Sequence, residues 1–236
     1  MRSCLIQLLV TAAVIFALLW FGLPFGASWL ATTALNSAGF AGTDTRVQVS
    51  ANLPPRILLG HADKIRLTST QVGVGDLHAA EMDVTLGNVE FFDRTIGTVA
   101  GTLTDVRVPS SNGDPITIST ATLNGVGTAA TATLALSTAE VAQLGQNQLQ
   151  TQTGIPSTVK LAAPDKVTIT VNGKAEAARL VAQNGAIVVV PASSALPMVT
   201  LIDNGTGNPF YFTSVAVGVS TVTLVGTIDV QSLLGL

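Results

Sequence analysis

The 236-residue chain has few of the side chains that most often carry out chemistry in proteins. It contains one cysteine and two histidines, charged residues make up 11% of it, and its formal net charge is −3. Because Cys4 is the single cysteine, the chain cannot form an internal disulfide. The clustered lysine and arginine of a nucleic-acid interface are also missing. These shortages argue against nucleic-acid binding and give no reason to expect a cofactor.

Motifs of the common enzyme classes are absent as well. The sequence has no G-x-S-x-G, H-E-x-x-H or C-x-x-C pattern and no phosphate-binding loop of the G-x-x-x-x-G-K type. The pairs His61 with Asp63 and Asp76 with His78 flank adjacent predicted strands, and together they have the chemistry to hold zinc or to act as acid and base. Solvated residues beside turns are the simpler interpretation, so we expect no enzyme and no metal site.

A polar loop near the C-terminus allows two further interpretations. The stretch 203–208, DNGTGN, resembles half of a calcium-binding loop but lacks the later acidic ligand, which argues against calcium. Asn204, Gly205 and Thr206 match the pattern of an N-glycosylation site.

Hydrophobic residues are abundant, at 47% of the chain, and the first long group of them is N-terminal. The run from Cys4 to Leu23 has no charged residue, and about 20 residues of helix span the roughly 30 Å of a bilayer core. Arg2 precedes the run, which predicts a cytoplasmic N-terminus and an exported remainder. We expect residues 1–25 to be an uncleaved signal anchor in the cell membrane. The alternative is a cleaved signal peptide and a secreted or periplasmic protein.

The rest of the chain divides into two parts. A short helix leaving the membrane is expected within residues 26–40, with Ser28 as its cap and Trp29 near the membrane interface. Residues 41–236 show no break in composition and no internal repeat, which indicates one exported domain.

Most of that domain alternates with a period of two, as strands do. The clearest strand lies in the stretch 53–89, where Ala80, Met82, Val84 and Leu86 form a dry face and Glu81, Asp83 and Thr85 a wet one. In other strands the apolar phase slips, as from Leu67 to Val72, from Leu103 to Val106 and from Val219 to Val222. Slips of this kind indicate bulges that bend a sheet, so the first two stretches are each predicted to be one bent strand. Residues 209–230 are predicted to form one or two strands, for which a single bent strand is the simplest account.

One helix and two tight turns complete the expected fold. The sequence 137–140, STAE, fits a capping box, and Val141, Leu144 and Leu149 keep helical spacing until Gly154. Asn172-Gly173 and Asn184-Gly185 predict two hairpin turns and hence a three-stranded meander. We therefore expect an α+β fold in which a long, highly curved antiparallel sheet has one helix lying against it.

Basic residues surround the Pro54-Pro55 turn that precedes the long strands. Arg56, Lys64 and Arg66 lie beside apolar residues, which suits an anionic lipid headgroup. The simpler interpretation is an ordinary charged face.

Several short segments follow one another in a distinctive order between residues 52 and 89: Asn52-Leu53-Pro54, Leu58-Leu59-Gly60, Ile65-Arg66-Leu67, Val74-Gly75-Asp76-Leu77, Met82-Asp83-Val84-Thr85-Leu86 and Val89. In this order they resemble the opening of a known family, the LmeA-like phospholipid-binding proteins of bacterial envelopes. This resemblance is the basis of the family expectation. It covers roughly residues 28–236 and is close in detail over the first third. It implies half of a tubular lipid-binding fold, in which the curved sheet wraps around a central helix.

Together, the apolar strands and the resemblance lead to a functional hypothesis: non-catalytic binding or transport of a phospholipid or related acyl lipid in the cell envelope. Acyl chains bind by burying methylene groups, at about 0.8 kcal/mol each, so few polar side chains are needed. The expected site is an apolar groove between the curved sheet and the helix. The residues expected to line it are Met82, Val84, Leu86, Val141 and Leu144, with Ile57 and Leu58 at the mouth. The alternative is a membrane-anchored structural or adhesive protein with a solid core.

Overall fold

A computed structural model of the chain describes residues 40–74, 77–108, 116–193, 196–204 and 210–230. The expected signal anchor, almost all of the expected membrane-proximal helix, Asp76 and most of the polar loop 203–208 lie outside these residues. Within the described part, no helix is long and apolar enough to cross a membrane.

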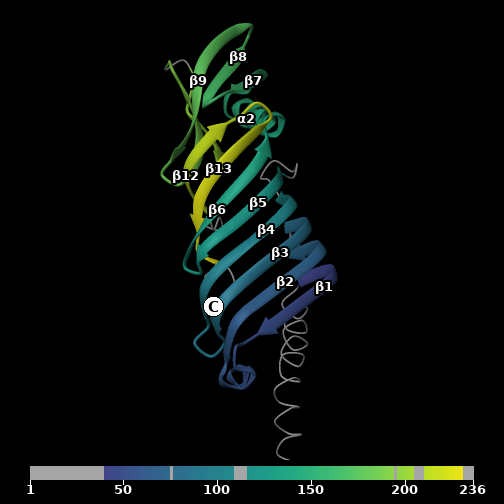
Figure 1. Cartoon of the computed structure of the whole chain (residues 1–236). Coiled ribbons are helices and arrows are strands. Elements are labelled where there is room, and N and C mark those ends of the chain that lie inside the picture. Colours follow the sequence, from purple (N-terminus) through teal and green to yellow (C-terminus); the bar gives the residue numbers. More distant parts are fainter. Residues whose placement is uncertain (1–39, 75–76, 109–115, 194–195, 205–209, 231–236) are drawn as a thin grey trace, which may run out of the picture.

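Two antiparallel sheets and one α-helix make up the described part of the chain (Figure 1). The large sheet has eight strands in the order β1-β2-β3-β4-β5-β6-β13-β12. Their bounds are β1 Phe40–Ser50, β2 His61–Val74, β3 Leu77–Glu90, β4 Thr95–Val108, β5 Ile116–Val126, β6 Ala129–Ser137, β12 Phe210–Val217 and β13 Thr221–Ile228. Figure 1 shows this sheet curling into half of a barrel, as the slips in apolar phase predict.

The second sheet is smaller and is inserted in the sequence between β6 and β12. Its five strands lie in the order β11-β10-β9-β8-β7. Their bounds are β7 Ser157–Ala162, β8 Lys166–Val171, β9 Lys174–Gln183, β10 Ala186–Pro191 and β11 Val199–Ile202. The two predicted hairpins are confirmed, because Asn172 and Asn184 adopt φ values of 49° and 52° and each is followed by glycine, as tight hairpin turns require.

The predicted helix is confirmed as α2, Thr138–Thr153. The Ser137 hydroxyl accepts a hydrogen bond from the Glu140 backbone N–H at 3.1 Å, which is half of the expected capping box. The helix packs chiefly against β7 and β11, and less against β6 and β13. It therefore covers one end of the large sheet, beside the small sheet, instead of running along the middle of β2–β4.

The phase slips of neighbouring strands lie at the same place in the sheet. Thr70 of β2 pairs with Glu81 of β3, Glu81 pairs with Thr104 of β4, and Thr104 pairs with Thr120 of β5, without a shift of register across the slip. In β2 and β4 the slip coincides with positive φ values at Gln71 (50°) and Asp105 (48°). The strands therefore bend along one common line, which curves the sheet as a unit.

The predicted bent strand at the C-terminus is wrong. The apolar phase changes between Val219 and Val222 because the chain turns back there, so that β12 and β13 form an antiparallel hairpin. The Gly218 N–H donates to the Thr221 carbonyl at 2.8 Å and closes the turn. Val219 is at the turn and is fully exposed. At the other end, β1 begins at Phe40, earlier than the alternation from Arg46 indicates, and it is interrupted by register shifts around Thr43.

Candidate functional site

The large sheet carries apolar residues in rows that cross its strands on one face. Ladder pairing places the members of the central row side by side, one from each of the eight strands: Val47, Leu67, Val84, Gly101, Leu123, Ala132, Gly226 and Phe212. The rows on either side contain Val49, Ile65, Leu86, Val99, Gly125, Ala130, Ile228 and Phe210, and Ser69, Met82, Leu103, Ala121, Leu134, Leu224 and Val215. We call these three rows the apolar face, in which Ser69 is the one polar residue.

Two glycines of the central row show which way the sheet curls. A Cβ added to Gly101 would point toward the apolar face and would lie 2.8 Å from the Asp83 carbonyl oxygen and 2.9 Å from the Cα of Val84. A Cβ added to Gly226 would lie 2.7 Å from the Tyr211 carbonyl oxygen. The backbone of the neighbouring strand has thus moved onto the apolar side at both positions, which makes the apolar face the inner side of the curl.

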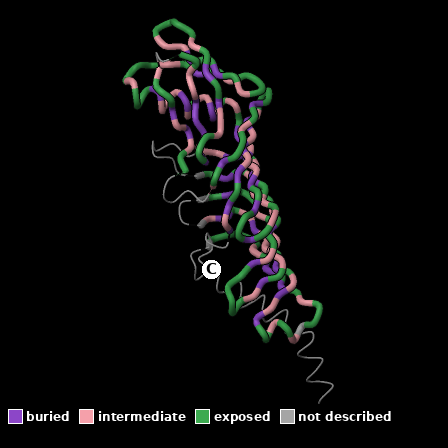
Figure 2. Tube along the Cα trace, turned by 90° about the vertical axis from the view of Figure 1, so that its left-hand side faces the viewer, coloured by how far each residue is buried: buried purple, intermediate pink, exposed green. Residues whose placement is uncertain are grey.

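The middle of the apolar face is less covered than its ends. Its half-buried members are Leu67, Met82, Val84, Leu86, Leu103 and Leu123, whereas Val99 of β4 and Ala121 of β5 are buried. At one end Leu134 and Leu224 are buried in the main core with α2 and the small sheet, and at the other Val49 and Ile65 are buried in a smaller cluster with Val47 and Val89. Figure 2 shows the distribution of buried and half-buried residues along the elongated molecule. Apolar surface in the middle is therefore accessible from outside the chain.

The structure brings the expected groove residues together only in part. Met82, Val84 and Leu86 lie on the apolar face, one in each row. Met82 packs against the same core as Val141, which is buried, and Leu144 is half-buried on α2. Val84 and Leu86 instead pack against a cluster around Val99. Sequence reasoning missed Leu67, Leu103 and Leu123 as site residues, although alternation in their strands marks them as apolar.

The opposite face of the sheet is polar. Arg66 donates to both carboxylate oxygens of Asp83, from Nε at 3.0 Å and from Nη2 at 2.7 Å. This guanidinium lowers the pKa of the Asp83 carboxyl below its ordinary value. A shallow depression of about 330 Å³ lies beside the pair, between Asp44, Arg46 and several threonines. Arg66 is thus engaged on the polar face, away from the apolar rows, and Lys64 is exposed.

A network of charged side chains lies at the end of the large sheet where β2 begins and β3 ends. His61 Nε2 is 2.7 Å from Asp63 Oδ1, and its Nδ1 is 2.5 Å from Glu90 Oε1, so both ring nitrogens face a carboxylate. The bonds to Asp63 and Glu90 raise the pKa of the His61 imidazole. Asp63 also accepts a hydrogen bond from the Asn52 backbone N–H, and this bond, followed by the one to His61, lowers the pKa of its carboxyl.

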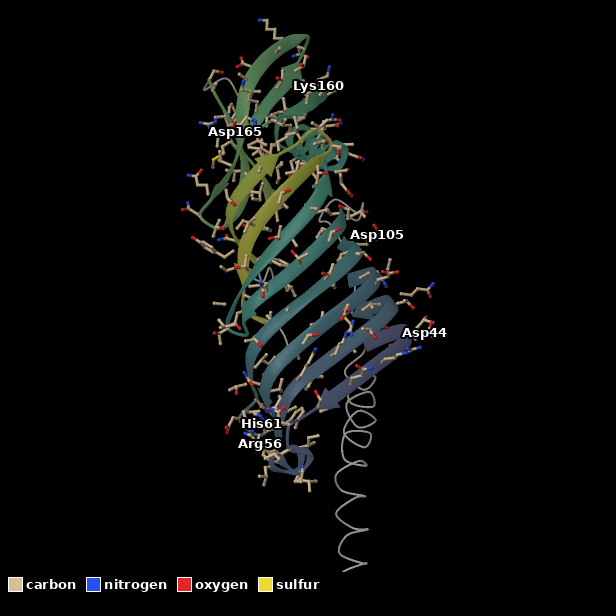
Figure 3. The ribbon with its side chains drawn as sticks, viewed as in Figure 1. Asp44, Arg56, His61, Asp105, Lys160 and Asp165 are labelled. Atoms are coloured by element: carbon tan, nitrogen blue, oxygen red, sulfur yellow. The ribbon has the colours of Figure 1, made fainter. Side chains whose placement is uncertain are left out.

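The two histidines do not come together. His61 pairs with Glu90 and His78 pairs with Gly73, which places the histidines at opposite ends of the β2–β3 hairpin. The described residues contain no group of His, Cys, Asp and Glu suited to a metal ion. Figure 3 shows His61 and Arg56 at the lower end of the molecule. The Arg56 Nη1 atom is 3.9 Å from Asp63 Oδ1, a long ion pair in which half of the arginine side chain remains exposed.

The two residues expected at the groove mouth point in different directions. Both lie in the 3₁₀ helix η1, Pro54–Leu59. Ile57 is half-buried against the cluster that contains Val49 and Ile65, whereas Leu58 is exposed. Leu53, Leu59, Phe91 and Phe92 are also exposed and were missed from the sequence. Two adjacent phenylalanines between strands, where turns are usually polar, are the signal that marks this surface.

No protein-family model, curated protein or solved structure matches the chain, so the resemblance to LmeA-like proteins stays a prediction from the sequence.

Proposed function

We propose that the protein binds a phospholipid or a related acyl lipid on its apolar face, without catalysis, in the bacterial cell envelope. The observation that carries the proposal is the central row, which crosses eight strands without a polar side chain and is half-buried in the middle. Seven steps of about 4.8 Å between strands give the row a length of roughly 34 Å. One leaflet of a bilayer core is about 15 Å thick, so an acyl chain fits lengthwise.

The energy of such binding follows from how far the face covers the chain. Full burial of a methylene group is worth about 0.8 kcal/mol. The side chains in the middle of the face are half-buried, and a chain lying on them is covered from one side, which reduces the gain to about 0.4 kcal/mol per methylene. A lipid with two long chains is therefore held by many small contributions and needs no built-in charged pocket.

The location in the envelope is supported by the sequence. The apolar run from Cys4 to Leu23 and the charge at Arg2 favour an exported domain anchored in the cell membrane. Binding, storage and transport of lipid all use the same apolar face, and the anchor keeps the domain beside its source of lipid.

The test compares two adjacent residues on opposite faces of β3. Val84→Asp places a carboxylate in the central row, where an acyl chain would desolvate it, whereas Thr85→Asp places the same group on the polar face opposite Arg66. The full chain and both variants are extracted in a mild detergent, and retained lipid is measured by mass spectrometry. We expect lipid in the wild type and in Thr85→Asp, and a large loss in Val84→Asp.

Absence of lipid from the wild type, and failure to take lipid from liposomes, would overturn the proposal. The chain would then be better described as an anchored structural or adhesive protein.

A further inference from the structure

Five large apolar side chains protrude at the end of the molecule that lies beyond the apolar face. They are Leu53, Leu58, Leu59, Phe91 and Phe92, and they are between 43% and 77% exposed. The first three belong to η1 or precede it, and the two phenylalanines belong to the turn between β3 and β4. We call these five residues the apolar tip. Exposed apolar residues gathered in this way mark an interaction surface, because single ones are normally scattered.

The two segments of the tip are fixed to each other. The Phe91 N–H donates to the Gly60 carbonyl at 2.7 Å. A Cβ added to Gly60 would lie 2.4 Å from the Phe92 ring, so the ring sits directly over this glycine. Gly60 also has a φ of 83°, which few other residues adopt. The tip is therefore a preformed surface that presents its side chains together.

Charge around the tip is nearly balanced. The basic groups Arg56, Lys64 and Arg94, with the imidazole of His61, are near the carboxylates of Asp63, Glu90 and Asp93. A strongly charged partner would find no complementary field here. Leucine and phenylalanine beside a few paired charges suit the boundary between lipid headgroups and acyl chains, where such residues concentrate.

The chain's own sequence brings a bilayer within reach. Residues 24–39 connect the apolar run Cys4–Leu23 to β1, and 16 residues extend to about 55 Å at most. The strand β1 places Phe40 about 33 Å from the tip end of the sheet, where Ser50 pairs with Lys64, so the connection has to cover about this distance. With the apolar run in the membrane, the tip can touch the same bilayer without strain in the connection.

We propose that the apolar tip inserts into the interface of the bilayer that holds the N-terminal run. Leu58, Leu59 and Phe92 enter the boundary region, and the lower end of the apolar face then opens toward the acyl chains. This inference goes beyond the proposed function, because a tip can rest in a bilayer whether or not the apolar face binds lipid.

The experiment uses the full chain reconstituted in phosphatidylcholine vesicles. In a Cys4→Ser background, a single cysteine at Leu59 or at Phe92 carries an environment-sensitive fluorophore, and some lipids carry a quencher just below the headgroup. The control position is Val219, which is fully exposed in the β12–β13 turn, in the upper part of Figure 1 and far from the tip. We expect a blue shift and about twofold quenching at both tip positions, because interfacial side chains reach this depth, and neither change at Val219.

Two variants separate this inference from the proposed function. Leu59→Asp, at an exposed tip position outside the expected groove, is expected to abolish quenching of the Phe92 probe, while circular dichroism and lipid retention stay as in the wild type. Val84→Asp is expected to lose lipid and keep the quenching. Unquenched tip probes would overturn the inference, and a blue shift without quenching would show that protein, from this chain or a second copy, covers the tip instead.

Discussion

The curl of the large sheet depends on the absence of a side chain at Gly101, and replacing this glycine gives a direct test. Gly101→Ala adds one methyl group on the inner side of the curl. That methyl would lie 2.8 Å from the Asp83 carbonyl oxygen and 2.9 Å from the Cα of Val84, both of them backbone atoms that cannot rotate away. The neighbouring strand must move outward, or the methyl group must remain compressed.

The cost is that of overpacking a well-packed site, about 1 to 3 kcal/mol of unfolding free energy. The sign of the change in unfolding free energy is informative. Alanine restricts the unfolded chain more than glycine does, and this effect by itself stabilises a strand by about 0.5 to 1 kcal/mol. A net loss of stability therefore reports the close approach of β3 to β4. Because the strands separate, we also expect Gly101→Ala to retain less lipid.

Gly145→Ala is the matched control. A Cβ at Gly145, in the middle of α2, would lie 3.5 Å from the Val159 methyl groups, which is ordinary contact. The unfolding free energy of this variant should exceed that of the wild type by about 0.5 to 1 kcal/mol, since glycine weakens a helix. Unfolding of the full chain in urea, followed by circular dichroism, measures both changes. If Gly101→Ala is as stable as the wild type or more stable, the close approach of the strands, and the curl inferred from it, is wrong.

Three further predictions concern the ligand and the charged groups. Across a series of lysophospholipids, each two added methylenes should strengthen binding about fourfold, from about 0.4 kcal/mol each; an affinity that ignores chain length would contradict an acyl site. The pKa of His61 is raised because both of its ring nitrogens bind carboxylates. The unfolding free energy that His61→Gln removes should therefore be fully present below pH 6.5 and vanish as the pH rises through the pKa of His61 in the folded protein. If the difference in unfolding free energy between wild type and variant grows with pH, the proposed bonds of His61 to Asp63 and Glu90 are refuted. Arg66→Ala should change the free energy of unfolding in urea only slightly, because the pair with Asp83 is about half exposed and screened by water, and should leave lipid retention unchanged.

Local features of this fold could be predicted from the sequence because neighbouring residues determine them. The Asn172 and Asn184 turns, the Ser137 cap and the slips at Val72 and Val106 each depend on a few adjacent side chains. Features that depend on pairing between distant strands could not be predicted in this way. The sequence does not show that the slips share one line across β2–β5, because that requires the register of each pair.

The same limit explains what was missed in the candidate site. His61 binds Glu90, which lies 29 positions away in the sequence, so spacing could not identify this carboxylate as its partner. The C-terminal hairpin was missed because Gly218, Val219 and Ser220 form no strong turn motif, and a phase slip looks the same in a bend and in a turn. Leu67 and Leu123 were recognised as strand residues, but only the register places both in one row with Val84, with Leu67 directly beside it and Leu123 on the far side of Gly101.

The position of the small sheet within the chain affects how the large sheet is completed. Each of the strands β2 to β6 pairs with the strand that precedes it in the sequence, so β1–β6 can assemble in the order of synthesis. β6 can pair with β13 only after the residues between them have been synthesised, and at usual rates of synthesis this delay is on the order of ten seconds. During this time an apolar strand edge is open to pairing with other chains.

The finished sheet protects its edge on this side. Its last strand, β12, has a shifted register after Phe212. Segments inserted before it also cover its free side, because the Phe212 N–H donates to the Gly185 carbonyl at 3.0 Å and the Val217 N–H to the Pro164 carbonyl at 2.7 Å. The inserted small sheet delays completion of the large sheet, and it also supplies the carbonyl groups that protect the final edge strand from aggregation.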